Sequence, residues 1–361
     1  MIRNIIINLT VVLLSLILVL ILGEMTLRVY HYYKFGINIL NDVNHGLFTK
    51  DNKLGWKMSK NLSYETTVKD ALKNVYKIHV KTNEYGFRVF DNPLSNKIKI
   101  FFVGDSFTAA LEISNDKTYY GIIRNKIKNI GVFAYGAGGY GSLQEFMILD
   151  EFIDVINPDL IIWQFFENDF FDNDINLDML KSFYNTGMPR PYLEENGRIT
   201  YRYAKYDNLF YALPDIFAEN IRLLKFFNTR LSVLVNKPLK NKSGPQEIAQ
   251  LGLAHKGFGH SAKITKMIME MVKMRAGKIP VYLFCITNNQ PYYDTIKNIC
   301  QSVGIHFFDG VPQSLNKFEN EKLYSTKAGD KEHLNEKGNK IVSERLIELL
   351  KENNYPIITA E

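Results

Sequence analysis

Ser106 is the residue whose neighbours best suit it to act as a nucleophile. It stands in the sequence Gly104-Asp105-Ser106-Phe107-Thr108, directly after the apolar run 98–103. A serine at the carboxyl end of a buried strand, next to a glycine that lets the backbone turn, can present its hydroxyl to a crevice. The chemistry to expect is acyl transfer through a covalent serine intermediate. A helix-capping serine has the same local sequence, so the prediction depends on which residues join Ser106.

A serine hydroxyl needs a base, and His333 is the candidate. Histidine is the side chain whose ordinary pKa suits proton transfer near neutral pH. Of the seven histidines, only His333 combines a carboxylate three residues earlier, Asp330, with a place in a loop that enters a helix. We expect Asp330 to accept a hydrogen bond from one ring nitrogen and to fix the tautomer. The alternative for Asp330 is a helix cap, whereas His255 and His260 are interpreted as loop residues.

Attack on an ester carbonyl creates an oxyanion, which requires donors that already point at it. Three are expected: the backbone N–H groups of Ser106 and Gly139 and the side-chain amide of Asn168. Gly139 lies in the glycine-rich loop 136–141, and Asn168 follows the apolar run 160–166. Taken alone, Asn168 is equally typical of a turn after a strand.

These loops meet only if parallel strands bring them to one edge. From residue 97 onward apolar strands alternate with amphipathic helices, a pattern typical of right-handed βαβ units and a parallel sheet covered on both faces. The expected strands are 98–103, 132–135, 160–166, 281–286 and 306–308; the expected helices are 119–127, 143–156, 264–276, one from residue 292, and 338–351. We predict an α/β fold, a three-layer α/β/α domain with a mostly parallel, flavodoxin-like central sheet, over residues 97–350.

Four sequence motifs have been named: the serine turn 104–108, the glycine-rich loop 136–141, Asn168, and the Asp330/His333 pair. Together they resemble the SGNH hydrolase superfamily, also called the GDSL esterases, over roughly residues 97–169 and 261–350. The resemblance implies that Ser106 is the nucleophile, that Gly139 and Asn168 are oxyanion donors, and that Asp330 and His333 complete the site. Three positions depart from the family pattern without removing a catalytic group: Phe107 in place of leucine, Ala134 in place of a frequent asparagine, and Leu334 in place of a frequent proline. These departures concern the subfamily.

The glycine-rich loop also matches the dinucleotide-binding fingerprint. Gly136-x-Gly138-x-x-Gly141 lies between a strand and a helix, and the acid Glu167 follows at the end of the next strand. A dinucleotide-binding protein is therefore an alternative. It leaves Ser106, Asn168 and the Asp330/His333 pair without a role.

Residues 172–178 have the alternating acidic spacing of a calcium loop. Leu177 stands in place of the required glycine and Phe183 in place of the bidentate glutamate, so we expect a solvated acidic loop. Cys285 and Cys300 show neither disulfide nor zinc spacing. No metal and no cofactor are predicted. A GxSxG elbow is absent, which argues against the α/β-hydrolase fold.

The N-terminus predicts a membrane anchor over residues 1–23. No charged residue occurs between positions 5 and 23, and the run 11–22 is broken only by Ser15, enough to cross a hydrocarbon core of roughly 30 Å. No small-x-small cleavage site or lipoprotein cysteine follows, so the segment is interpreted as an uncleaved signal anchor with the globular domain outside the cytoplasm. Arg28 and Lys34 flank its far side, which leaves the orientation open.

Two further segments surround the predicted catalytic domain. Residues 24–96 are interpreted as a membrane-proximal extension with short strands, for example 76–81, and a turn at 83–86. Residues 170–260 are an insertion rich in aromatic side chains, expected to form a lid or substrate wall. The alternative is that these aromatics pack a small core of their own.

The sequence therefore predicts a membrane-anchored serine esterase or O-acyltransferase acting on acyl, above all acetyl, esters of an extracytoplasmic glycan. The alternatives are a lipid esterase of the same fold and a non-catalytic glycan-binding or assembly protein. A net charge of +6, with cations scattered among acids, gives no indication of nucleic-acid binding. The acyl group, water or a hydroxyl as acceptor, and the oligomeric state stay open.

Overall fold

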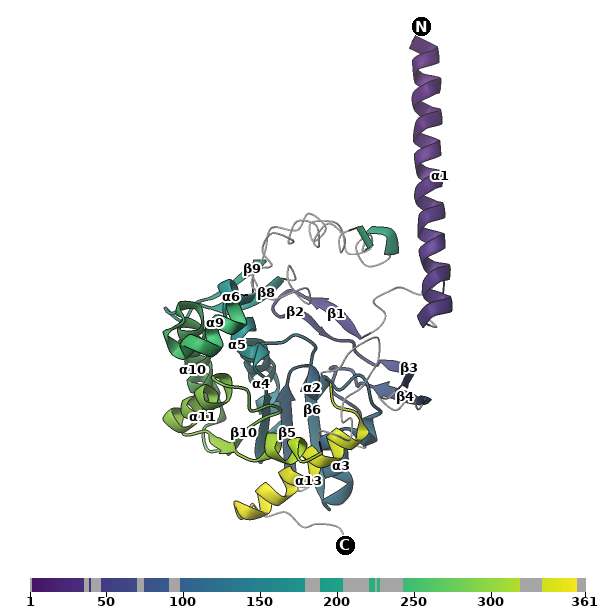
Figure 1. Ribbon diagram of the computed structural model, residues 1–361. Helices are drawn as coiled ribbons and strands as arrows, with labels where there is room; N and C mark the ends of the chain where they lie inside the picture. Colours follow the sequence, from purple (N-terminus) through teal and green to yellow (C-terminus); the bar gives the residue numbers. More distant parts are fainter. Residues whose placement is uncertain are drawn as a thin grey trace. The chain divides into compact units, whose positions relative to one another are not determined.

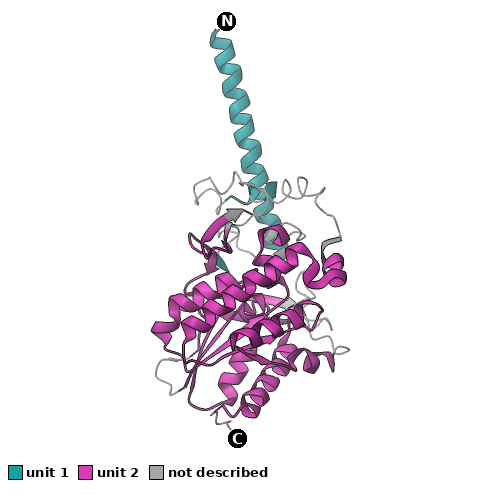
Figure 2. Cartoon of the chain, turned by 90° about the vertical axis from the view of Figure 1, so that its left-hand side faces the viewer, with its two compact units in different colours: residues 1–49, 206–240 teal, residues 50–205, 241–361 magenta. Residues whose placement is uncertain are grey.

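The computed structural model describes residues 2–35, 39, 47–69, 75–90, 98–178, 189–203, 221–224, 226–227, 243–318 and 333–355. The chain forms two compact units, residues 1–49 with 206–240 and residues 50–205 with 241–361 (Figure 2). Each unit is described by itself. Two positions singled out from the sequence, Phe183 and Asp330, lie outside the described residues.

A five-stranded parallel sheet is the centre of the larger unit (Figure 1). Its strands, in spatial order, are β11 (His306–Phe308), β10 (Val281–Cys285), β7 (Leu160–Phe165), β5 (Ile98–Gly104) and β6 (Ile130–Gly136). The order along the sheet reverses at β5, whose neighbours are β6 and β7. In sheets of this flavodoxin-like order, ligands bind beyond the carboxyl ends of the strands at such a reversal.

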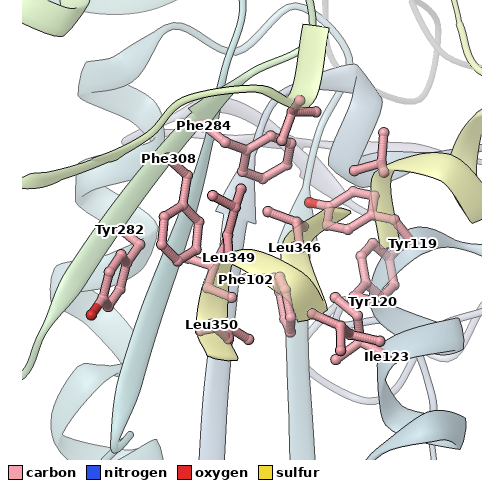
Figure 3. Close-up of a cluster of buried hydrophobic side chains, with 14 of the residues drawn as sticks. Phe102, Tyr119, Tyr120, Ile123, Tyr282, Phe284, Phe308, Leu346, Leu349 and Leu350 are labelled. Carbon is pink, nitrogen blue, oxygen red and sulfur yellow. The ribbon is translucent and has the colours of Figure 1, made fainter. Parts of the chain in front are cut away.

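Helices cover both faces of the sheet because its strands are apolar on both sides. On one face α3 (Tyr119–Lys126) and α13 (Glu336–Glu352) pack on alternate strand residues such as Phe102 and Phe284, and Figure 3 shows this cluster. On the other face lie α4 (Ser142–Ile156), α10 (Lys256–Ala276) and α11 (Tyr292–Val303). The predicted three-layer α/β/α fold is confirmed.

Helix α10 begins at Lys256, eight residues before the predicted start. His255 lies just outside the helix and caps it, its Nδ1 accepting from the Phe258 N–H (3.2 Å). His260 lies inside the helix, so the expectation that it is a loop residue was wrong. Gly257 and Gly259 lower the helix propensity of this turn. A Cβ on Gly259 would lie 2.6 Å from the Leu253 carbonyl oxygen, so close packing requires the glycine that obscured the helix.

The extension forms two small sheets of two strands each, which pack on the sheet domain. They are β1 (Phe48–Asp51) with β2 (Gly55–Met58), and the hairpin of β3 (Ser63–Lys69) and β4 (Val75–Lys81). The predicted turn at 83–86 is present, with Gly86 at φ +93°. Beyond it the buried Arg88 guanidinium donates to the carbonyl oxygens of Ala109 (3.1 Å) and Ile113 (2.9 Å).

The described part of the insertion contains short elements. These are α5 (Asn168–Asp172), α6 (Ile175–Asp178), the hairpin of β8 (Pro189–Leu193) and β9 (Ile199–Tyr203), and α9 (Ser243–Leu251). Strand β8 contacts α4 and β2. The insertion and the extension therefore touch each other beside the helix that follows the glycine-rich loop.

Helix α1 (Ile2–Phe35) is the main element of the smaller unit. Its stretch Ile2–Tyr30 is long and apolar enough to cross a membrane, although a signal sequence has the same composition. The Glu24 carboxylate accepts from the backbone N–H groups of Arg222 (3.1 Å) and Leu223 (2.7 Å). A segment of the insertion thus docks at the end of the apolar run.

Candidate active site

Ser106 is the first residue of the short helix α2 (Ser106–Ala109), which follows β5 directly. Asp105 caps this helix, its Oδ1 accepting from the Phe107 N–H (2.9 Å), while its own N–H donates to Gln164 Oε1 (3.2 Å). Asp105 and Phe107 are buried and Ser106 is partly exposed. The turn is therefore anchored on both sides of the serine, whose side chain alone reaches the surface.

The two glycines next to this turn are required by close packing. A Cβ on Gly104 would lie 2.4 Å from Thr108 Oγ1, and a Cβ on Gly136 would lie 2.4 Å from the Ala109 nitrogen. The sequence interpretation of Gly104, that it frees the backbone to turn, is corrected, because its φ is not in the left-handed region. Strands β5 and β6 pair Gly104 with Gly136, so both loops leave the sheet side by side.

His333 lies beside the serine turn. Its ring centroid is 5.2 Å from that of Phe107, although 226 positions separate the two residues along the chain. Helix α13 begins just after it, and its cap is Asn335, whose Oδ1 accepts from the Gly338 N–H (3.0 Å). The capping role considered for Asp330 is thus filled by another residue. Asp330 itself is outside the described part of the chain, so its pairing with His333 stays a prediction.

The three expected oxyanion donors follow adjacent strands. Ser106 follows β5, Gly139 follows β6 with φ +76°, and Asn168 begins α5 just after β7. The Ser106 N–H, at the start of a helix, has no partner within that helix. Asn168 Nδ2 donates one hydrogen to Asp172 Oδ2 (3.0 Å), which leaves its second N–H for a ligand. The topology thus brings all three to the sheet edge where β5 and β7 end.

Buried carboxyl groups surround the base of the site. Burial raises the pKa of Asp105 to about 6. The hydrogen bond from the Phe107 N–H and the nearby charge of His333 act in the opposite direction and lower this pKa. Burial, with the charges of Asp169 and Asp105, raises the pKa of Glu145 well above its usual range. Burial thus favours the neutral form of both carboxyl groups.

The acidic run 172–178 is buried, so the expectation of a solvated loop was wrong. Asp172 pairs with Arg190 of β8, Asp174 with His260 of α10, and Asp178 accepts from the Tyr192 hydroxyl (3.2 Å). These partners lie far away in the sequence, so local composition did not reveal them. Among the described residues, no group of His, Cys, Asp and Glu is arranged to hold a metal ion.

The glycine-rich loop is filled by protein groups, which disfavours a dinucleotide site. The Gly138 carbonyl accepts from Trp56 Nε1 (3.0 Å), and the Gly139 carbonyl from Arg190 Nη2 (3.0 Å). A Cβ on Gly141, at the start of α4, would lie 2.7 Å from the Asp172 Cβ. A pyrophosphate needs that helix start free and positive, and here an acidic residue covers it.

Sequence reasoning missed Trp56, Arg190 and Gln164. Trp56 is one of two tryptophans, and Arg190 stands between two prolines in the insertion. Trp56 and Arg190 carry no motif, and each reaches the glycine-rich loop only through the tertiary fold.

No family model and no curated protein matches the chain. Among solved structures, the fold is similar to a lipolytic protein of the G-D-S-L family from Veillonella parvula DSM 2008, with 11% identity, a TM-score of 0.39, and coverage of 70% of this chain and 98% of that one. A lipase/acylhydrolase from Enterococcus faecalis has 11% identity, a TM-score of 0.38 and coverage of 73% and 99%. An acetylxylan esterase from Geobacillus stearothermophilus has 12% identity, a TM-score of 0.38 and coverage of 72% and 96%. At these values, the chain's own residues must carry the functional assignment.

Proposed function

We propose that the chain is a serine esterase or O-acyltransferase of SGNH type that works through an acyl-Ser106 intermediate. The observation that carries the proposal is the placement of His333 against Phe107, next to a serine that is the one partly exposed residue of its turn. Oxyanion donors at the ends of the two neighbouring strands support it. A candidate nucleophile, a candidate base and candidate oxyanion donors thus lie at this edge of the sheet, which supports an acyl-transfer reaction.

In the first half of the reaction, a ring nitrogen of His333 takes the Ser106 proton as Oγ forms a bond to the acyl carbon. The carbonyl electrons move to oxygen, where the N–H groups of Ser106, Gly139 and Asn168 stabilise the charge. Collapse of the tetrahedral intermediate breaks the bond to the alcohol, which leaves with the proton from His333.

In the second half, an acceptor hydroxyl attacks the acyl-enzyme. His333 removes the acceptor's proton and returns it to Ser106 Oγ as the ester bond breaks. Water as acceptor gives a carboxylic acid, and a sugar hydroxyl gives a new ester. We propose that Asp330 holds His333 in the tautomer that both halves require.

For the substrate, we propose O-acetyl groups of a glycan outside the cytoplasm, with helix α1 as the membrane anchor. The apolar stretch of α1 supports membrane attachment. We propose that the partly exposed Phe166, whose ring centroid lies 4.9 Å from that of the buried Phe107, supplies an apolar wall beside the serine. An acetyl group is small enough to rest against such a wall.

A fluorophosphonate probe tests the nucleophile. We expect the wild-type chain to be labelled and Ser106→Ala to lose labelling, while Ser114→Ala is labelled normally. Equal labelling of the Ser106→Ala variant would contradict the assignment. Incubation with an acetylated polysaccharide then distinguishes hydrolysis, which releases acetate, from transfer, which moves acetyl to an added sugar. Turnover of long-chain lipid esters alone would replace the glycan with a lipid substrate.

A further inference from the structure

The Gly139 N–H is aimed by a side chain of the extension. Trp56 of β2 donates its Nε1–H to the Gly138 carbonyl oxygen (3.0 Å). That carbonyl and the Gly139 N–H belong to one planar trans peptide, so they point in opposite directions. A bond that fixes the carbonyl therefore also fixes the direction of the N–H. Trp56 is itself held, because the Tyr140 hydroxyl donates to its carbonyl oxygen (2.5 Å).

A side chain of the insertion joins Gly139 to the other donor. Arg190 Nη2 donates to the Gly139 carbonyl oxygen (3.0 Å), and its Nη1 pairs with Asp172 Oδ1. The second Asp172 oxygen accepts from Asn168 Nδ2 (3.0 Å). An unbroken chain of hydrogen bonds thus runs from the Gly139 carbonyl oxygen to the Asn168 side-chain amide through one arginine and one aspartate.

The two positioning side chains also contact each other. The Arg190 guanidinium carbon lies 5.3 Å from the centre of the Trp56 ring, within the range of a cation–π contact. Arg190 and Asp172 are fully buried and Trp56 is 3% exposed. Arg190 also neutralises Asp172, whose bare charge beside the site would oppose a developing oxyanion.

We propose that Trp56 and Arg190 form a clamp that positions the oxyanion donors Gly139 and Asn168. The clamp rests on the proposed function, and it assigns a shared role to two segments that flank the catalytic core, the extension and the insertion. Both are positioning residues, since neither needs to touch the substrate.

The kinetic test is Trp56→Phe, which keeps an aromatic ring over Arg190 and removes the N–H. Loss of a whole donor costs about 10²–10³ in kcat, so a misaimed donor should cost about tenfold to hundredfold, with KM within about twofold. Trp163→Phe is the matched control, because it makes the same change at a fully buried tryptophan of β7. If both variants have the same kcat, the clamp is overturned.

Arg190→Met leaves Asp172 buried and unpaired, so this variant alone can fail to fold. The double variant Arg190→Met with Asp172→Asn removes both charges together. We expect the double variant to fold. Its kcat should stay at least tenfold below that of wild type, because the Gly139 carbonyl has lost the arginine that holds it. Arg198→Met, at an exposed arginine, is the control. If the double variant has the kcat of wild type, Arg190 only compensates the charge of Asp172, and its positioning role is overturned.

A spectroscopic measurement separates failure of the clamp from failure of the proposed function. Gly138–Gly139 is the only Gly–Gly pair in the sequence. Full-length protein labelled with carbonyl-¹³C and ¹⁵N glycine therefore gives one carbonyl–nitrogen correlation, that of the Gly139 amide. We expect this resonance to shift and broaden in Trp56→Phe and to stay in place in Trp163→Phe. An unchanged resonance in Trp56→Phe overturns the clamp, whereas a shift in a chain that hydrolyses no ester contradicts only the proposed function.

Discussion

The imidazole ring of His333 lies 5.2 Å from the phenyl ring of Phe107, with an angle of 52° between the two planes. Phe107 is 6% exposed and also packs on Phe166. It occupies the position after the serine at which the SGNH pattern has leucine. The aromatic ring thus sets the position of His333, the proposed base, relative to Ser106, the proposed nucleophile.

Smaller side chains at position 107 should therefore lower kcat progressively. We expect Phe107→Leu, which retains an apolar side chain, to keep kcat within about threefold of wild type. Phe107→Ala removes the surface against which His333 rests and should lower kcat about tenfold or more, because small misplacements of catalytic groups are costly. Ester hydrolysis at saturating substrate measures both. Full activity of the alanine variant would exclude this role.

Asn168→Ala tests the proposed role of this side chain as an oxyanion donor. Its removal should lower kcat about 10²–10³-fold, or about 2.7 to 4 kcal/mol of transition-state stabilisation. KM should change little, because the donor acts on charge that develops during the reaction. Asn176→Ala changes an exposed asparagine of the same region and is the control. A loss in KM alone would make Asn168 a substrate-binding residue.

Asp105 should make the fold less stable as the pH rises. Burial raises its pKa to about 6 from 3.8, so the folded state holds this proton more tightly than the unfolded chain does. The stability it contributes is present at low pH and is lost between about pH 4 and pH 6. Asp105→Asn keeps an oxygen for the Phe107 N–H and removes the titration. Denaturant unfolding of both proteins from pH 4 to 8 should show the variant gaining on wild type across this window, and parallel curves would contradict it.

Glu24 should protect the insertion from proteolysis. Its carboxylate accepts the N–H groups of Arg222 and Leu223, and Arg222 is 1% exposed. In Glu24→Ala these backbone groups lose their acceptor, so trypsin should cleave after Arg222 several times faster. Limited proteolysis followed by mass spectrometry measures the rate. Glu65→Ala, at an exposed position of the β3–β4 hairpin, is the control, and equal rates would show that the contact is not protective.

The sequence predicted the sheet and the loops that carry the site because both depend on local patterns. Apolar runs of three to seven residues mark buried strands, and parallel strands must bring the loops after them together. Ser106, Gly139 and Asn168 could be placed on one edge in this way. Asp330 lies outside the described residues, so its pairing with His333 stays a prediction.

The structural features that the sequence did not predict depend on contacts between distant segments. Asp172, Asp174 and Asp178 look solvated until Arg190, His260 and Tyr192 fold over them. Gly257 and Gly259 look like loop residues because the packing that demands them is tertiary. No periodicity records that Trp56 reaches Gly138, since hydrogen bonds across 82 positions leave no local signal.

Arg88 has a consequence for how this protein can be cut into pieces. Its guanidinium donates to the carbonyl oxygens of Ala109, the last residue of the helix that begins with Ser106, and of Ala110 and Ile113, which follow that helix. A recombinant fragment that starts at Lys97 would lose this arginine together with Trp56. Three carbonyls would then lie at a protein surface without their donor, and the serine turn would lack its support. A soluble fragment that retains the fold should instead begin near Lys50, so a catalytic module transplanted between proteins of this kind must bring its preceding strands with it.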